Sequence, residues 1–147
     1  MAMNLRTSAL TISTGNRLQS HISQFLQGRY DIGSVEWRML VVLSEQPDLR
    51  MNQITQITEM DKAAVSRALT KLGEKRLAKA EVDKDNQRSK SWQLTPAGSA
   101  LHDVVRAEYL KLQSEIFAGI EEAEMSQACD VLNSIKSNLD QIEDSDR

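Results

Sequence analysis

The sequence predicts a mainly α-helical protein with one small β-hairpin, and three observations support this fold class. Aromatic residues make up only 4% of the 147 residues, and glycine and proline together number eight, six plus two. This composition argues against a β-sandwich or barrel, which needs many turns and many β-branched and aromatic residues. Apolar residues recur at three- and four-residue spacing over most of the chain, the period of a helix face. Residues 77–82 and 90–94 can instead be read with alternating faces, the period of a strand.

The composition also bounds the class of protein. With 40% hydrophobic and 27% charged residues, the chain is predicted to be one soluble globular domain. The longest apolar run, Met39 to Leu43, is far too short for a membrane helix, and no signal peptide is evident at the amino terminus. A single cysteine, Cys129, fits a reducing compartment. We therefore expect a cytoplasmic protein without a membrane partner.

The first predicted helix runs from Asn4 to about Arg29. Its apolar residues, Leu18 and Ile22 among them, follow helical spacing until residues 30–33 break the pattern. This helix can therefore cover an apolar surface along one face.

The second predicted helix runs from Val35 to about Glu45. Ser34 is its predicted N-cap, and Glu36 adds a favourable negative charge in the first turn. The helix is apolar nearly all round, which places it at the centre of the core, and Pro47 ends it.

Two shorter helices are predicted next. Asn52 is expected to cap the first, which turns Ile54 and Ile57 inward, and Asp61 the second, from Lys62 to about Arg76. The apolar stripe of this second helix comprises Val65, Ala68, Leu69 and Leu72. Its residues that lie largely away from that stripe are Lys62, Ala63, Ser66, Arg67, Thr70 and Lys71.

The change of period over residues 77–82 and 90–94 predicts two strands. Trp92 and Leu94 fall on the same side of the second strand, and the polar segment 83–89 separates the two. The pair is therefore predicted to form a hairpin with a charged tip.

The remaining residues predict two long helices. Thr95 and Pro96 are a strong helix start, since threonine can cap and proline loses nothing at the first helical position. This helix is expected to reach about Ala118, and Gly119 separates it from a last helix over residues 121–142. Apolar residues on the last helix step by four, three, four and three, a seam suited to packing on another helix: Ala128, Leu132, Ile135, Leu139 and Ile142.

The net charge of −3 hides an asymmetry along the chain. Residues 51–95 carry nine lysines and arginines against six acids, which gives +3. Residues 1–50 carry five against four and residues 96–147 four against eleven, which gives +1 and −7. A polyanionic partner would therefore contact the middle of the chain.

A helix, a short turn, a second helix and a hairpin form the winged helix-turn-helix arrangement. The second helix must keep one apolar face on the core and present small or hydrogen-bonding residues to the major groove. Ala63 and Ser66 permit close approach, and the guanidinium of Arg67 can bind guanine or a phosphate. The order of elements therefore predicts a reader of double-stranded DNA.

Three motifs resemble the multiple-antibiotic-resistance regulator (MarR) family. They lie at residues 61–72, 83–90 and 94–98, within a match that extends over residues 34–98. The first holds Asp61-Lys62 and Val65-Ser66-Arg67, the second ends in Arg88-Ser89-Lys90, and the third is Leu94-Thr95-Pro96-Ala97-Gly98. All three stand in register at the spacing of the family.

The resemblance implies a homodimeric transcription regulator. Residues 34–95 would form the winged DNA-binding region, and residues 1–33 and 96–147 a helical dimerisation region. By this resemblance, the chain is expected to bind a pseudo-palindromic operator and to repress transcription, and a small-molecule effector bound between the two regions could release the DNA. The expected dimerisation residues are Leu18, Ile22, Leu132, Ile135, Leu139 and Ile142. The expected DNA-binding residues are Lys62, Ala63, Ser66, Arg67, Thr70, Lys71, Lys84, Arg88 and Lys90.

One position departs from the family pattern. The resembling family usually braces its wing arginine with an aspartate two residues before it, and here Asn86 stands two residues before Arg88. An asparagine accepts a hydrogen bond but supplies no charge. An alternative is therefore a winged protein-interaction module without DNA binding.

A thiol-based redox regulator that uses Cys129 is a second alternative, although the surrounding acids predict an unreactive thiol. His21 and His102 stand apart from other potential ligands, so no metal site is predicted and no cofactor is expected. Because no catalytic motif is present, we expect a protein that is not an enzyme.

Overall fold

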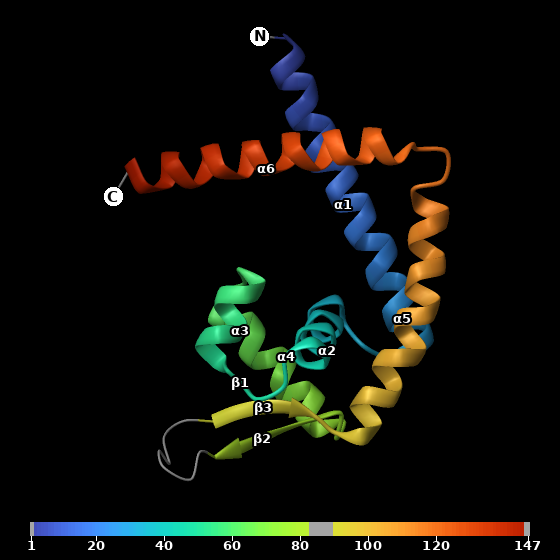
Figure 1. Ribbon diagram of the computed structural model, residues 1–147, viewed down its shortest axis with the longest axis vertical. Helices are drawn as coiled ribbons and strands as arrows, with labels where there is room; N and C mark the ends of the chain where they lie inside the picture. Colours follow the sequence, from blue (N-terminus) through green and yellow to red (C-terminus); the bar gives the residue numbers. More distant parts are fainter. Residues whose placement is uncertain (1, 83–89, 146–147) are drawn as a thin grey trace. The chain divides into compact units, whose positions relative to one another are not determined.

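The computed structural model describes residues 2–82 and 90–145 (Figure 1). Its elements, in chain order, are α1 (Ala2–Tyr30), α2 (Ser34–Glu45), β1 (Leu49–Arg50), α3 (Met51–Thr58), α4 (Lys62–Glu74), β2 (Ala78–Val82), β3 (Lys90–Leu94), α5 (Pro96–Ile116) and α6 (Glu122–Ser145). They form two compact units, Met1–Glu108 and Tyr109–Arg147. No helix among the described residues is both long enough and apolar enough to span a membrane.

The first unit contains the winged helix-turn-helix, as the sequence predicts. Helices α2, α3 and α4 gather beside a small antiparallel sheet (Figure 1). The core consists of residues that the helical spacing turns inward, among them Leu40, Leu43, Ile54 and Leu69, all at most 2% exposed. Helix α2 lies at its centre, as its nearly continuous apolar sequence requires.

The sheet has three strands in the order β1-β3-β2, one more than the sequence predicts. Strands β2 and β3 form the predicted hairpin, with Ala80 opposite Trp92. The additional strand β1 is two residues long, and its Leu49 lies opposite Trp92 on the other edge of β3. So short a strand has no recognisable alternation, which explains why the sequence does not reveal it.

Two predicted helix caps are wrong by one or two residues. Helix α2 begins at Ser34, and its N-cap is Gly33, whose backbone is extended and which supplies no side chain to the first turn. Helix α3 begins at Met51, and its N-cap is Arg50, whose backbone N–H donates to Gln53 Oε1 at 2.9 Å. A glutamine at the third helical position can satisfy the N-cap donor, so Asn52 is not needed there.

The prediction that Ile57 turns inward is wrong, because this residue is 45% exposed. Thr58 takes the buried position on α3, four residues after the buried Ile54. Its hydroxyl donates to the Ile54 carbonyl at 2.7 Å, so a polar residue is buried there with its hydrogen bond satisfied.

The second unit contains the last turns of α5 and the whole of α6, joined around Gly119 with its positive φ of 79°. Glycine adopts this left-handed conformation without the steric cost that a side chain brings. The predicted break between the two long helices is therefore confirmed.

Candidate nucleic-acid interface

Helix α4 is fixed at its start and along one face. The Asp61 carboxylate accepts the backbone N–H groups of Ala63 at 2.9 Å and Ala64 at 3.0 Å, which is the predicted cap. The predicted stripe of Val65, Ala68, Leu69 and Leu72 is buried, with at most 4% exposure. The orientation of α4 about its own axis is therefore set by the core.

The opposite side of α4 is open to solvent. The six residues predicted there are all exposed: Lys62, Ala63, Ser66, Arg67, Thr70 and Lys71. The Thr70 hydroxyl donates to the Ser66 carbonyl at 2.9 Å, which leaves its oxygen able to accept a hydrogen bond from a ligand. This side offers two small residues, two hydroxyls and three cations, the chemistry that a major groove requires.

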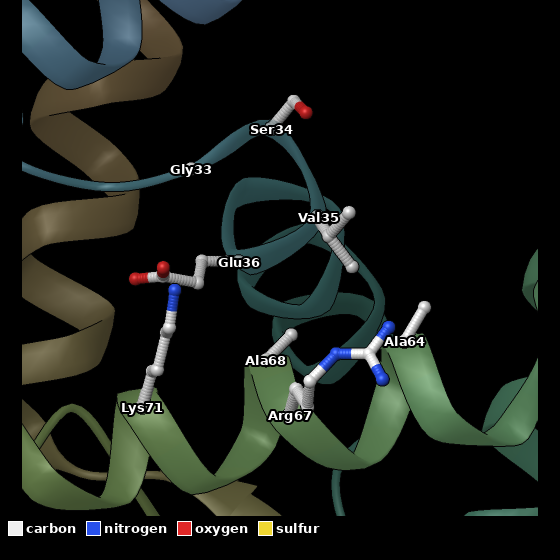
Figure 2. A pocket seen from close by; sticks show the side chains of 8 residues that line it. All are labelled: Gly33, Ser34, Val35, Glu36, Ala64, Arg67, Ala68 and Lys71. Atoms are coloured by element: carbon white, nitrogen blue, oxygen red, sulfur yellow. The ribbon is translucent and has the colours of Figure 1, made fainter.

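A hollow of about 230 Å³ separates the first turn of α2 from α4. Figure 2 shows Arg67 and Lys71 rising from α4 on the side that faces α2, with Ala64 and Ala68 at the base. The carboxylate of Glu36, in the first turn of α2, also lines the hollow and offsets part of the positive potential of the two cations. With two cations against one carboxylate, this corner keeps a positive excess that suits a phosphate or the edge of a guanine.

The end of α4 is held by a partly buried ion pair that the sequence does not reveal. Lys75 Nζ lies 3.0 Å from Glu36 Oε2, and the Glu36 side chain is only 7% exposed. Lys75 also donates to the backbone carbonyl of Asp31 in the turn between α1 and α2. The sequence predicts only a first-turn charge for Glu36, because 39 residues separate it from its partner.

A second junction joins the end of α4 to the start of α5. The Thr95 hydroxyl donates to the Arg76 carbonyl at 2.7 Å and accepts the Gly98 backbone N–H at 3.1 Å. A Cβ on Gly98 would lie 1.9 Å from the Leu77 carbonyl oxygen, so only glycine fits. This contact explains physically why threonine and glycine stand three residues apart in this motif.

The hairpin contributes Lys90, which is exposed at the start of β3 and lies opposite Val82 of β2. The other predicted wing cations, Lys84 and Arg88, lie outside the described residues, as does Asn86. Their part in the interface stays a prediction.

The predicted dimerisation residues divide into two sets. Leu18 and Ile22 on α1 are half-buried. Four residues on α6 are 36% to 58% exposed: Leu132, Ile135, Leu139 and Ile142. The seam on α6 is therefore an apolar surface open to solvent in the single chain.

Neither the described histidines nor Cys129 form a metal site. Among residues 2–82 and 90–145, no three His, Cys, Asp or Glu residues are grouped so that they could hold an ion. Cys129 is a free, exposed thiol on α6.

Residues 30–89 match the MarR family. Over 130 residues the chain is 33% identical to the HTH-type transcriptional regulator TcaR of Staphylococcus aureus (strain Newman), covering 86% of this chain and 74% of that protein. A MarR/EmrR family transcriptional regulator from Acinetobacter sp. ADP1 superposes with a TM-score of 0.83 at 29% identity, over 95% of this chain and 98% of the other. The S. aureus MepR–DNA complex shares the fold, with a TM-score of 0.81 at 24% identity over 90% of this chain and 97% of the other.

Proposed function

Because the chain belongs to the MarR family of DNA-binding transcription regulators, we propose that it binds a pseudo-palindromic operator as a homodimer. Each chain would place α4 in a major groove, with the two half-sites about one helical turn, roughly 10 bp, apart. The observation that carries this proposal is α4 itself, capped by Asp61, held by its buried stripe and open on its other side.

The two kinds of residue on α4 would divide the work of recognition. Ala63 and Ser66 let the backbone of α4 approach the base edges, and the hydroxyl of Thr70 can bond to them. Arg67 and Lys71 line the hollow beside α2, where they would also attract a phosphate. Lys62 would add to this attraction at the start of α4.

The wing would supply contacts to the backbone next to the groove. We assign this role to Lys84, Arg88 and Lys90. An arginine in the minor groove is attracted by its negative potential, whichever bases are present. The wing would therefore contribute affinity more than sequence preference.

The dimer would be formed by residues 1–33 and 96–147 of both chains. The exposed seam on α6 supports this assignment, because a contiguous apolar surface is unfavourable in water and favours association. Leu18 and Ile22 on α1 would complete the interface.

Binding would occlude a promoter and repress it, and a small effector would relieve the repression. We assign the chain a DNA-binding role without catalytic activity, and we place it in the cytoplasm. These features rest on the family resemblance and on the composition of the chain.

The proposal is tested by selecting bound duplexes from a random pool. We expect a pseudo-palindrome to emerge. Arg67→Ala should then weaken binding to it by about 1–3 kcal/mol and relax the preference at one position. Arg88→Ala should instead weaken specific and random duplexes alike and lower the salt dependence by about one phosphate contact.

The matched control is Arg38→Ala, which removes an exposed arginine of α2 that belongs to neither the proposed DNA-binding residues nor the dimerisation region. If no sequence is enriched, or if both variants bind as the wild type does, the chain is instead a winged module that binds protein partners.

A further inference from the structure

A second hollow, of about 340 Å³, lies in the first unit between the end of α2, strand β3 and the start of α5. None of the proposed DNA-binding residues that the structure describes lines it. Its apolar lining comes from Leu43, Pro47 and Leu94. The hollow is therefore a separate site from the surface of α4.

His102 forms one wall of this hollow and is held from three sides. It is 8% exposed, and its ring stacks on Trp37 with the centroids 5.5 Å apart and the planes 19° from parallel. Its Nε2 lies 3.1 Å from Ser44 Oγ, and the Ser44 hydroxyl donates to the Val41 carbonyl at 2.7 Å. The ring is therefore held by Ser44 at Nε2 and by stacking on Trp37.

The same arrangement argues against a hydrolytic use of this cluster. Serine, histidine and aspartate act as a catalytic set when the serine hydroxyl donates to the histidine. Here the Ser44 hydroxyl has the Val41 carbonyl at 2.7 Å as an alternative acceptor, and the Asp103 side chain is 80% exposed, whereas the aspartate of such a set is buried. The cluster builds a rigid wall instead.

Asp103 gives the hollow its charge. Its Oδ1 lies 3.1 Å from His102 Nδ1, which fixes the carboxylate at the rim, and the Asp103 side chain is 80% exposed. The hollow is lined by this carboxylate and by the amide of Gln93, and no lysine or arginine lines it among residues 2–82 and 90–145. Its polar side therefore favours a ligand that donates hydrogen bonds and carries positive charge.

We propose that this hollow binds a small planar nitrogen cation, of the class of aromatic amidines and amines. The aromatic body lies against Leu43, Pro47 and Leu94, and the N–H groups bond to Asp103 and to the Gln93 amide oxygen. A carboxylic acid of the same shape is excluded, because its charge would meet the Asp103 carboxylate.

We also assign this hollow to the small-molecule effector that releases the DNA, and this part of the proposal rests on the proposed function. The hollow joins α2, which packs on α4, to β3, which belongs to the wing. Both α4 and the wing must fit the duplex at once, so a ligand that shifts β3 relative to α2 lowers the affinity for DNA. The coupling is reciprocal, and operator DNA lowers the affinity for the ligand by the same factor.

Benzamidine is the probe, with benzoate and the neutral benzamide as matched compounds. Backbone amide shifts of the ¹⁵N-labelled protein without DNA should locate benzamidine at the end of α2, β3 and the start of α5. So small a ligand is expected to bind with a Kd of about 1 mM. Benzamide should bind about tenfold more weakly, and benzoate not at all.

Asp103→Asn should weaken benzamidine binding about tenfold, whereas Asp130→Asn, which removes the same charge from α6, should leave it unchanged. Equal binding of benzoate, unchanged binding to Asp103→Asn, or shifts located elsewhere would overturn the site. A second measurement titrates operator DNA with and without benzamidine. Binding at the site with unchanged DNA affinity would overturn the regulatory role alone, and a failure to bind any DNA would count against the proposed function and not against the site.

Discussion

The winged region and the C-terminal region differ in where their apolar residues go. In the winged region the apolar stripes of α2 and α4 meet in one core, and Leu69 and Leu72 are fully buried. In the C-terminal unit, no residue from Tyr109 to Glu143 is buried, and Leu139 of the α6 seam is 54% exposed. The winged region thus buries its apolar residues within one chain, whereas the apolar residues of the C-terminal unit can be buried only against another surface.

This difference indicates that the two regions respond differently to the same substitution. A leucine in a core loses its contacts whatever the protein concentration. A leucine in an interface between chains loses contacts only where the chains associate, so its effect depends on concentration.

The largest effect is expected from Leu69→Ala, compared with Leu139→Ala. The core variant should lose about 2–5 kcal/mol of unfolding free energy at every protein concentration, because a cavity is left on α4. The loss in Leu139→Ala should shrink as the protein is diluted. Denaturant unfolding at two concentrations measures both, and a cost of Leu139→Ala that does not vary with concentration would place that leucine in a core of its own chain.

The next largest effect is expected at the junction of Thr95 and Gly98. Gly98→Ala would bring a Cβ against the Leu77 backbone, and the forced shift should cost about 1–3 kcal/mol. Gly28→Ala on α1, where nothing lies within 4 Å, should instead stabilise the helix by about 0.5–1 kcal/mol. Thermal unfolding of the two variants measures both effects. Equal unfolding midpoints would contradict the proposed clash between a side chain at residue 98 and the Leu77 backbone.

The ion pairs of the winged region allow a comparison of the same kind. Lys75→Met would leave the buried Glu36 carboxylate without its cation, at a cost of about 1–3 kcal/mol. The exposed Lys79–Glu81 pair, at 2.7 Å, should lose less than about 1 kcal/mol in Lys79→Met. Urea unfolding at neutral pH measures both, and a similar loss in each would mean that burial of Glu36 has no energetic consequence.

The smallest effect is expected from Cys129→Ser. The thiol is exposed and far along the chain from the winged elements, so stability should change by less than about 0.5 kcal/mol. Operator affinity before and after peroxide treatment should be the same in both proteins. A loss of affinity on oxidation that the serine variant escapes would support the alternative of a redox regulator.

Local patterns in the sequence were enough to predict the helices and the hairpin. The Asp61 cap, the α4 stripe and the helix start at Thr95 and Pro96 each depend on residues within one turn of one another, and all three are confirmed. The exposed side of α4 follows from the same periodicity.

What the sequence did not reveal depends on contacts between distant residues. The Glu36–Lys75 pair joins two helices, β1 exists only because β3 is its neighbour, and Gly98 is required by the Leu77 backbone. Thr58 rather than Ile57 is buried, because contacts with the core set the rotation of α3 about its axis. The apolar pattern of α3 alone predicts the wrong rotation. Such features have no signal within a short window of sequence.

The central claim is that each chain supplies one reading helix and that α6 pairs two chains on one operator. Sedimentation of the protein with a selected duplex tests it most directly, for the wild type and for Ile135→Asp/Leu139→Asp. The control is Asn133→Asp/Ser137→Asp, which adds the same charge on the opposite side of α6. We expect two chains per duplex for the wild type and the control, and a single chain with at least about 100-fold weaker binding for the seam variant. One wild-type chain per duplex, or a seam variant that pairs and binds like the wild type, would contradict the claim.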